Sequence, residues 1–146
     1  TSLELKPEVM EQRNLHLQAK YREIEEKEVR FETEHCDDAD CLIVAFGSAA
    51  RIAEKSVELA REQGIKAGLF RPITLWPFPS KALAEMAKGK RHILVAEINA
   101  GQMIQDVRLA VGNEVPVSHF GRLGGIVPDP TEIVGELKAK LEENGK

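Results

Sequence analysis

The side chains best suited to chemistry follow a strongly apolar run in the second half of the chain. Glu97 comes directly after residues 92–96, and Asn99 and Gln102 follow within five residues. A carboxylate in such a place can act as a general acid or base, and the two amides can donate and accept hydrogen bonds. The alternative is that these groups cap the next helix and brace their own loop. Because the sequence shows no evident second acid or histidine to pair with Glu97, we expect no complete catalytic pair.

Two other turns contain groups that can bind an anion. Gly47 and Ser48 follow the apolar run 41–46, and backbone N–H groups at a strand-to-helix turn can bind a phosphate. One glycine makes neither a dinucleotide-binding fingerprint nor a P-loop, so Ser48 as a helix N-cap is the simpler interpretation. Arg122 lies in the glycine-rich segment 119–125, where it would hold a phosphate, pair with a partner's carboxylate or face solvent.

The segment 71–79 is expected to form a stiff, extended loop that begins with Arg71. It contains three prolines, which fix φ and prevent a helix. It also contains Trp76 and Phe78, two large rings in a chain that is only 5% aromatic. Rings on a rigid loop make good protein contacts because little conformational entropy is lost on binding. The alternative is that both rings cover the edge of the chain's own core.

The remaining titratable residues show no catalytic or metal-binding pattern. The four histidines lack the spacing of metal ligands, and no serine–histidine–aspartate order is present. Cys36 and Cys41 are the only cysteines, too few for an iron–sulfur cluster. We expect both to be reduced, buried thiols rather than a disulfide or redox pair, which points to the cytoplasm.

Composition and charge exclude several classes of protein. Of the 146 residues, 42% are hydrophobic and 30% are charged, which is typical of one folded domain. No apolar run approaches the roughly 20 residues that span a bilayer, so no membrane partner is expected. The net charge is −4 and no basic patch with interleaved aromatics occurs, so nucleic acid is not expected as a partner.

Alternating strands and helices must position these turns. Apolar runs predict strands at 41–46, 66–70, 92–96 and 115–120. The expected helices run from the turn at Gly47 through Gln63, from 80 to 88, from 102 to 111 and from Pro130 onward. This alternation indicates right-handed crossovers and a mostly parallel sheet with helices on both faces, which is a three-layer α/β/α sandwich.

Local signals mark several ends of these elements. Gly64 is expected at the C′ position of one helix and Ser80 at the N-cap of the next. Asp129 is expected to cap the last helix, with Glu132 in its first turn. Residues 29–33 alternate apolar and polar side chains, which predicts a short, half-buried edge strand, antiparallel to the sheet.

Residues 7–28 predict a helix with a narrow apolar stripe on a heavily charged rod. The stripe consists of Met10, Leu17, Tyr21 and Ile24. It needs a docking surface, which is either the domain itself or a preceding domain. We expect a domain cut from a longer chain, since the sequence starts at Thr1 and its first thirty residues have the character of a connector. Residues 1–39 would form a connector helix and edge strand, and residues 40–146 the α/β domain.

Several of these segments resemble a known family. Residues 40–48 are similar to the strand that opens the C-terminal domain of transketolase-like, thiamine-diphosphate-dependent enzymes. The segments 64–79, 97–102 and 121–125 together resemble the C-terminal domain of the α subunit of 2-oxoacid:ferredoxin oxidoreductases, the branched-chain and 2-oxoglutarate types included. The likeness covers residues 40–141.

The resemblance implies a transketolase C-terminal-like domain that holds subunits together and shapes the approach to the active site. The whole enzyme would oxidatively decarboxylate a 2-oxo acid to an acyl-coenzyme A and pass electrons through iron–sulfur clusters to ferredoxin. Thiamine diphosphate, magnesium and the clusters would lie in other domains and subunits, so no cofactor is expected in this domain. Its partners would be those domains and subunits, with ferredoxin and coenzyme A as partners of the whole enzyme.

We therefore expect a non-catalytic assembly domain, inactive alone, within such an oxidoreductase. The candidate interface residues are Arg71, Trp76, Phe78, Glu97, Asn99, Gln102 and Arg122. The alternative is an independent α/β domain that binds a small anionic or nucleotide ligand at the carboxyl ends of the strands, through Gly47, Ser48 and Arg122. A stand-alone enzyme that uses Glu97 is a third hypothesis, and it lacks partner residues.

Overall fold

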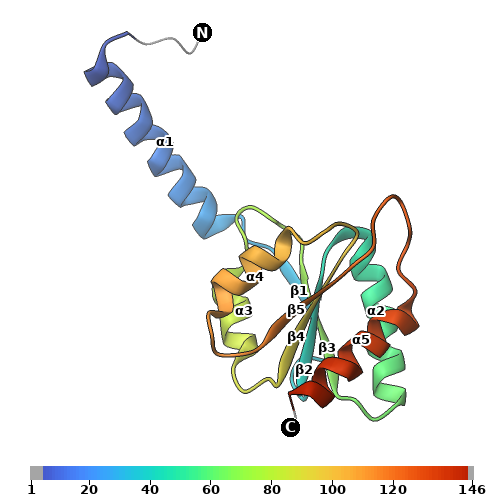
Figure 1. The fold of residues 1–146 in the computed structure, drawn as a ribbon. Helices are drawn as coiled ribbons and strands as arrows, with labels where there is room; N and C mark the ends of the chain where they lie inside the picture. The colour runs from blue at the N-terminus through green and yellow to red at the C-terminus, as the bar shows by residue number, and fades with distance from the viewer. Residues whose placement is uncertain (1–4, 145–146) are drawn as a thin grey trace.

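The computed structural model describes residues 5–144 and places a five-stranded sheet between two pairs of helices, with one more helix extending from the sheet edge (Figure 1). The strand order is β1-β3-β2-β4-β5. The strands are β1 Phe31–Glu34, β2 Cys41–Ala45, β3 Ala67–Pro72, β4 His92–Glu97 and β5 Val117–Gly121. Strands β2 to β5 are parallel to one another and β1 is antiparallel to β3. The predicted mostly parallel sheet with an antiparallel edge strand is confirmed.

Helices cover both faces of this sheet and complete the predicted three layers. On one face lie α2 (Gly47–Glu62) and α5 (Pro130–Glu143), and on the other lie α3 (Ser80–Ala87) and α4 (Met103–Val111) (Figure 1). Because successive side chains of a strand point to opposite faces, Ile43 enters the core beneath α2 and α5, whereas Leu42 and Val44 enter the core beneath α3 and α4. Every residue of β2 and β4 is buried, as expected for strands covered on both faces.

Strand β1 is more exposed than its alternating pattern predicts. Only Glu34 is partly buried, and Phe31 remains 40% exposed although its ring stacks on that of Phe70, with centroids 5.2 Å apart. The expected half-buried strand is therefore wrong in its degree of burial. The reason is coverage: β1 packs on β3, and none of the helices makes an extensive contact with it.

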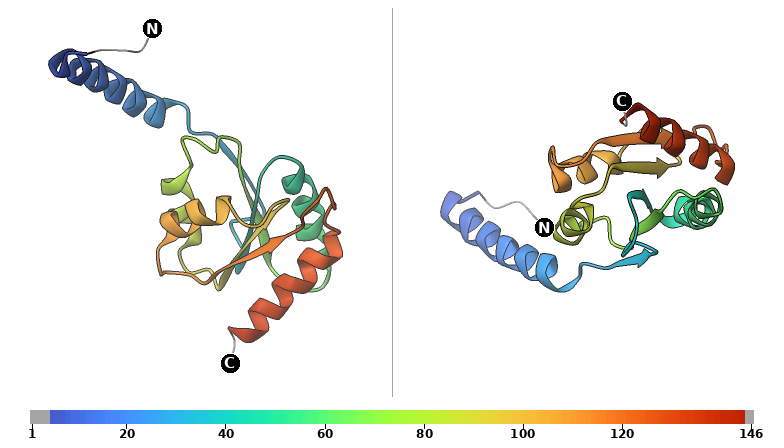
Figure 2. Two further views of the ribbon diagram at one scale, coloured as in Figure 1. Left: turned by 45° about the horizontal axis from the view of Figure 1, so that its top comes forward. Right: turned by 90° about the horizontal axis from the view of Figure 1, so that it is seen from below.

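Helix α1 (Pro7–Lys27) extends away from the sheet and its helices (Figures 1 and 2). None of its residues is buried. Near its C-terminal end, the Tyr21 ring meets Trp76 edge to face, with centroids 5.7 Å apart. Apart from this contact of Tyr21, the stripe of α1 does not pack on the α/β domain, which was the first of the two docking surfaces that the sequence left open. Among residues 5–144, no helix is both long and apolar enough to cross a membrane.

The helix ends confirm two of the expected signals. Gly64 follows the last residues of α2 with φ +81°, its N–H donates to the carbonyl of Arg61, and the N–H of Ile65 donates to that of Ala60. These two bonds form a Schellman motif. Asp129 caps α5, and with Glu132 it forms a reciprocal capping box.

The two predicted serine caps are wrong by one or two residues. Phe46 is the N-cap of α2, and its carbonyl accepts from Ala50, so Ser48 already lies in the first turn. Pro79 is the N-cap of α3, and its carbonyl accepts from Leu83, which puts Ser80 at the first helical position. In both places the helix begins directly after a residue that caps it through its backbone carbonyl, so neither serine occupies the cap position.

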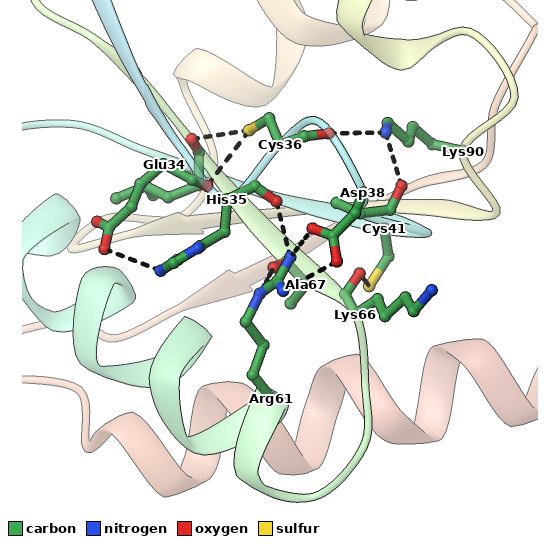
Figure 3. A network of polar contacts seen from close by, with 11 residues as sticks. Glu34, His35, Cys36, Asp38, Cys41, Arg61, Lys66, Ala67 and Lys90 are labelled. Atoms are coloured by element: carbon green, nitrogen blue, oxygen red, sulfur yellow. Dashed lines mark hydrogen bonds and ion pairs between the residues drawn. The ribbon is translucent and has the colours of Figure 1, made fainter.

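Two cations hold the turn between β1 and β2 at the amino ends of the parallel strands (Figure 3). Arg61 of α2 donates to the carbonyls of His35 and Ala67 at 2.8 and 2.7 Å and pairs with Asp38 at 2.6 Å. Lys90 donates to two more carbonyls of this turn. The turn also contains Cys36, which is buried and free like Cys41, as the sequence predicts.

Candidate functional site

The carboxyl ends of the four parallel strands lie at one edge of the sheet, and the loops that follow them gather there (Figure 1). We call this surface the carboxyl-end face and define it as residues 46–48, 73–79, 98–102 and 122–128. In open α/β sheets this is the edge where ligands and partners bind. All seven candidate interface residues and both candidate anion-binding residues lie in it or directly beside it.

Glu97 is the best-anchored side chain at this edge. It is fully buried, and Oε1 accepts hydrogen bonds from the N–H groups of Met103 and Gln102 at 2.9 and 3.3 Å and from Asn99 Nδ2 at 3.1 Å. Oε2 accepts from the N–H of Ile104 at 3.2 Å. The carboxylate therefore caps the N-terminus of α4, where the helix dipole favours negative charge. Of the two roles that the sequence left open, these contacts match the capping and loop-bracing role.

His119 lies beside this carboxylate, a pairing that the sequence pattern did not predict. Its Nε2 is 3.6 Å from Glu97 Oε2, is buried and has no hydrogen-bond partner among residues 5–144. The sheet register explains the pairing. Glu97 is opposite Gly121, two residues after His119, so the side chains of Glu97 and His119 both point to the α3/α4 face. The two residues occupy positions that face the same side of two neighbouring strands. The sequence shows this only if the register of β4 against β5 is known.

Gly121 makes room for the imidazole. A Cβ at this position would collide with the ring of His119 and with the carbonyl oxygen of Asn99. The glycine thus lets the 98–102 loop and the imidazole both lie against the end of β5. Nothing larger than a hydrogen atom fits there.

The Glu97–His119 pair is poorly placed for chemistry on a substrate. A carboxylate and an imidazole can in principle serve as an acid–base pair. However, Glu97 has no exposed surface, and both of its oxygens are engaged by donors of the same loop and helix. Its role in this geometry is to hold the 98–102 loop against α4.

Arg122 is engaged within the chain. Both Nε and Nη2 donate to the carboxylate of Glu132 at the start of α5. The backbone N–H of Asp129 and the Arg122 guanidinium hold the pKa of Glu132 below its usual value. The arginine is therefore directed to α5 rather than to Gly47 and Ser48, and the side chain of Ser48 is exposed. Among residues 5–144, no hydrogen bond joins Arg122 to Gly47 or Ser48.

The two aromatic rings of the 71–79 segment differ, and each matches one of the two alternatives that the sequence left open. Trp76 is 57% exposed, whereas Phe78 packs against the core beneath α3 and α4. Arg71 belongs to β3 rather than to the loop, and its Nη1 pairs with Glu32 across the β1–β3 ladder at 2.7 Å. The peptide bond between Trp76 and Pro77 is cis. Trp76 is thus the ring of this segment that is available to a partner.

Exposed apolar side chains are concentrated on the carboxyl-end face. On this face they are Ile73, Leu75, Trp76, Ile98, Leu123, Ile126 and Val127. The other exposed large apolar side chains of residues 5–144 are Leu5, Val9, Leu15, Tyr21, Phe31 and Leu109. Within residues 5–144, the connections at the amino ends of the parallel strands show no exposed large apolar side chain. Contiguous exposed apolar surface rimmed by polar groups is typical of a protein contact.

The described part of the chain offers no metal site. Among residues 5–144, no group of three or more histidine, cysteine, aspartate or glutamate side chains is arranged to hold a metal ion. Both thiols lie at the opposite, amino-terminal edge of the sheet, among backbone carbonyls and cations (Figure 3).

Residues 39–133, more than half of the chain, match the protein-family model described as pyruvate:ferredoxin oxidoreductase core domain II. The chain belongs to this family. Core domain II covers all four parallel strands and reaches the first turn of α5, so it contains the whole carboxyl-end face. The resemblance on which the sequence analysis relied is confirmed.

Relatives of this core domain II chain are subunits of 2-oxoacid oxidoreductases. It is 41% identical over 138 residues to the ketoisovalerate oxidoreductase subunit VorB of Methanothermobacter thermautotrophicus, which covers 94% of this chain and 39% of that subunit. It is 40% identical over 112 residues to the 2-oxoglutarate synthase subunit KorA of Archaeoglobus fulgidus, covering 75% of this chain and 31% of that one. The chain therefore spans well under half the length of these relatives.

Solved structures show the same fold. The 2-oxoglutarate:ferredoxin oxidoreductase from Magnetococcus marinus, with 2-oxoglutarate, coenzyme A and succinyl-CoA bound, superposes with a TM-score of 0.80 at 21% identity. That match covers 94% of this chain and 24% of the other. A split-gene transketolase, an inactive beta4 tetramer, gives 0.66 at 19% identity over 77% of this chain and 41% of its own. The transketolase-like α/β fold predicted for this chain is confirmed.

Proposed function

We propose that this chain is the non-catalytic assembly domain of a thiamine-diphosphate-dependent 2-oxoacid:ferredoxin oxidoreductase. The observation that carries the proposal is the contrast at the carboxyl-end face. Its large apolar side chains are exposed, while the charged groups beside them, Glu97 and Arg122, are engaged within the chain. Such a surface is suited to contact with a protein rather than to bond-making.

The whole enzyme, in this proposal, converts a 2-oxo acid and coenzyme A to an acyl-coenzyme A and carbon dioxide, with electrons passing to ferredoxin. The names of the relatives, ketoisovalerate oxidoreductase and 2-oxoglutarate synthase, support a 2-oxo acid substrate. Thiamine diphosphate, magnesium and the iron–sulfur clusters would bind in other parts of the enzyme. The two buried thiols of this chain donate to backbone carbonyls and are too few to hold an iron–sulfur cluster. A cytoplasmic location accords with the two free thiols.

The proposal includes a division of the chain into two parts. Residues 1–39 would serve as the connector and residues 40–146 as the transketolase C-terminal-like domain. Strand β1 would then be the point at which the connector joins the sheet, through its ladder with β3. The other domains and subunits of the oxidoreductase would be the partners of the carboxyl-end face.

The alternative, an independent domain that binds an anion, has less support. It needs Arg122 free to face Gly47 and Ser48, and Arg122 is paired with Glu132 instead. A saturable rise in the melting temperature with phosphate or a nucleotide would favour this alternative, since a ligand that binds only the folded state stabilises it.

Truncation of Trp76 tests the assembly role. Trp76→Ala in the oxidoreductase that contains this chain should weaken association of its subunits by about 10-fold or more, because exposed aromatic anchors dominate binding energy. Sedimentation velocity measures the association, and circular dichroism with urea unfolding checks that the fold is retained.

Leu109→Ala is the matched control. Leu109 is 84% exposed on α4, outside the carboxyl-end face, so its truncation should leave association unchanged. Equal association of the wild type and both variants would count against Trp76 as an assembly contact.

A further inference from the structure

Helix α1 contains three complete heptads. With Pro7 as position a, the 21 residues of α1 end at position g with Lys27. The d positions are then Met10, Leu17 and Ile24, and the later a positions are Asn14 and Tyr21. In a two-stranded coiled coil the a and d positions face the partner. Here all three d positions are apolar, Tyr21 adds an aromatic ring at a, and Asn14 is the kind of polar residue that sets the register at a central a position.

The charges beside this seam favour two parallel copies. The g positions Arg13, Lys20 and Lys27 are all basic, as is Lys6 just before the helix. The e positions are Glu11, Gln18 and Glu25. In a parallel pair, g of one helix faces e of the following heptad in its partner, so basic residues meet Glu or Gln. An antiparallel pair would place g against g and set basic residues against one another.

The seam is uncovered in the structure. No residue of α1 is buried, and the helix points away from the sheet and its helices (Figures 1 and 2). At its C-terminal end the seam runs into the carboxyl-end face, because Tyr21 contacts the exposed ring of Trp76. An apolar stripe about 30 Å long on a helix of 21 residues is left for a partner to cover.

We propose that α1 pairs in parallel with α1 of a second copy of this chain, as a two-stranded coiled coil. This inference rests on the proposed assembly function and names one of its partners. The two α/β domains would lie side by side at the C-terminal end of the coil, each with its Trp76 beside the seam.

A pair of leucine variants tests the seam in the chain of residues 1–146. The wild type should sediment as a dimer at micromolar concentrations. Leu17→Glu puts a charge at the central d position and should weaken dimerisation at least 10-fold. Leu15→Glu is the same chemical change at a b position, 55% exposed on the opposite side of the helix, and should leave the dimer intact. A monomeric wild type, or a dimer that persists in Leu17→Glu, would overturn the proposal.

A charge exchange tests the orientation. Lys20→Glu alone and Glu25→Lys alone should each weaken the dimer by about 2- to 5-fold, because like charges then meet across the seam. The double variant should recover most of that loss in a parallel pair, since each g–e′ pair is again complementary. A double variant weaker than either single variant would exclude the parallel arrangement.

The outcomes separate this inference from the proposed function. If residues 1–146 remain monomeric while Trp76→Ala still weakens association in the whole oxidoreductase, the assembly role stands and the α1 pairing is wrong. If the dimer forms through α1 while Trp76→Ala leaves assembly unchanged, the α1 coiled coil is supported and the assembly role of the carboxyl-end face is wrong.

Discussion

At the scale of single residues, one buried carboxylate determines how the chain leaves the sheet after β4. Glu97 connects the end of the strand to the first turn of α4 through backbone N–H groups and Asn99. Glu97, Met103 and Ile104 are buried. Solvent therefore could not take the place of the carboxylate as the acceptor for the N–H groups of Met103 and Ile104. The shape of the 98–102 loop, and with it the exposed position of Ile98, depends on this one acceptor.

Glu97→Ala should lower the free energy of unfolding by about 3 kcal/mol, because several buried donors lose their acceptor at once. Urea unfolding monitored by circular dichroism measures the change. Glu54→Ala removes an exposed carboxylate from α2 and should change stability by no more than about 0.5 kcal/mol. A loss for Glu97→Ala as small as that of the control would show that the brace contributes little.

His92 makes the stability of the fold sensitive to acid. It is 2% exposed, Nε2 lies 2.7 Å from Ser118 Oγ, and Nδ1 lies 3.0 Å from Asn144 Nδ2. Burial, helped by the charge of Lys140, lowers the pKa of this imidazole below its usual 6.5, while Glu143 acts in the opposite direction. The unfolded chain therefore binds a proton at a higher pH than the folded chain does.

The free energy of unfolding should consequently fall as pH decreases through about 6.5, and level off below the folded-state pKa. His92→Gln should remove this part of the pH dependence, whatever its effect on stability at pH 8. His16→Gln, at an exposed position of α1, should retain the wild-type slope. Urea titrations between pH 5 and 8 provide the comparison, and an unchanged slope in His92→Gln would contradict the assignment.

How far the sequence predicts single residues depends on where their partners lie. Asp129 and Glu132 were predicted together because both halves of the capping box lie within four residues. The contact between Glu97 and His119 was not predicted, because it depends on the register of two strands that are twenty residues apart in the chain. The exposure of Trp76 and the partial burial of Phe78 were also beyond the sequence, since two rings of one loop differ only in which way they point.

At the scale of elements, a single glycine in the sequence predicts where α2 ends. Gly64 adopts φ +81°, which costs little for glycine and more for any residue with a Cβ. A Cβ there would meet no atom within 4 Å, so the cost of a substitution comes from the backbone alone. The two bonds of the Schellman motif then direct the chain toward β3.

Gly64→Ala should therefore destabilise the fold by about 1 kcal/mol. Gly135→Ala is a matched control inside α5, where a Cβ also meets nothing within 4 Å and the backbone is helical. It should stabilise the fold by about 0.5–1 kcal/mol, because alanine is the better helix former. Thermal unfolding of the two variants tests the contrast, and shifts of the same sign would contradict it.

The sequence predicts elements well where burial dominates their composition. Strands β2 and β4 are continuous apolar runs, and both were predicted to within one residue. Strand β1 and helix α1 were predicted in place and type but not in burial. Periodicity reports which side of an element is apolar, and it does not report what covers that side.

At the scale of the whole molecule, the two edges of the sheet have opposite characters. At the amino-terminal edge, Arg61 and Lys90 bind backbone carbonyls and close the turn between β1 and β2 (Figure 3). At the other edge, the loops of the carboxyl-end face leave apolar side chains exposed. This difference between the two edges agrees with a domain that presents one edge of its sheet to the rest of an enzyme, and the chain belongs to the core domain II family.

The two buried thiols at the amino-terminal edge of the sheet can report how readily that edge opens. Cys36 is 4% exposed and Cys41 fully buried, and burial raises the pKa of both thiols, that of Cys41 to about 11. Alkylating reagents attack the thiolate, so a closed molecule reacts very slowly at neutral pH. Each alkylated cysteine therefore records that this edge has opened. The rate of alkylation then compares how readily the edge opens in the isolated chain and inside an assembly.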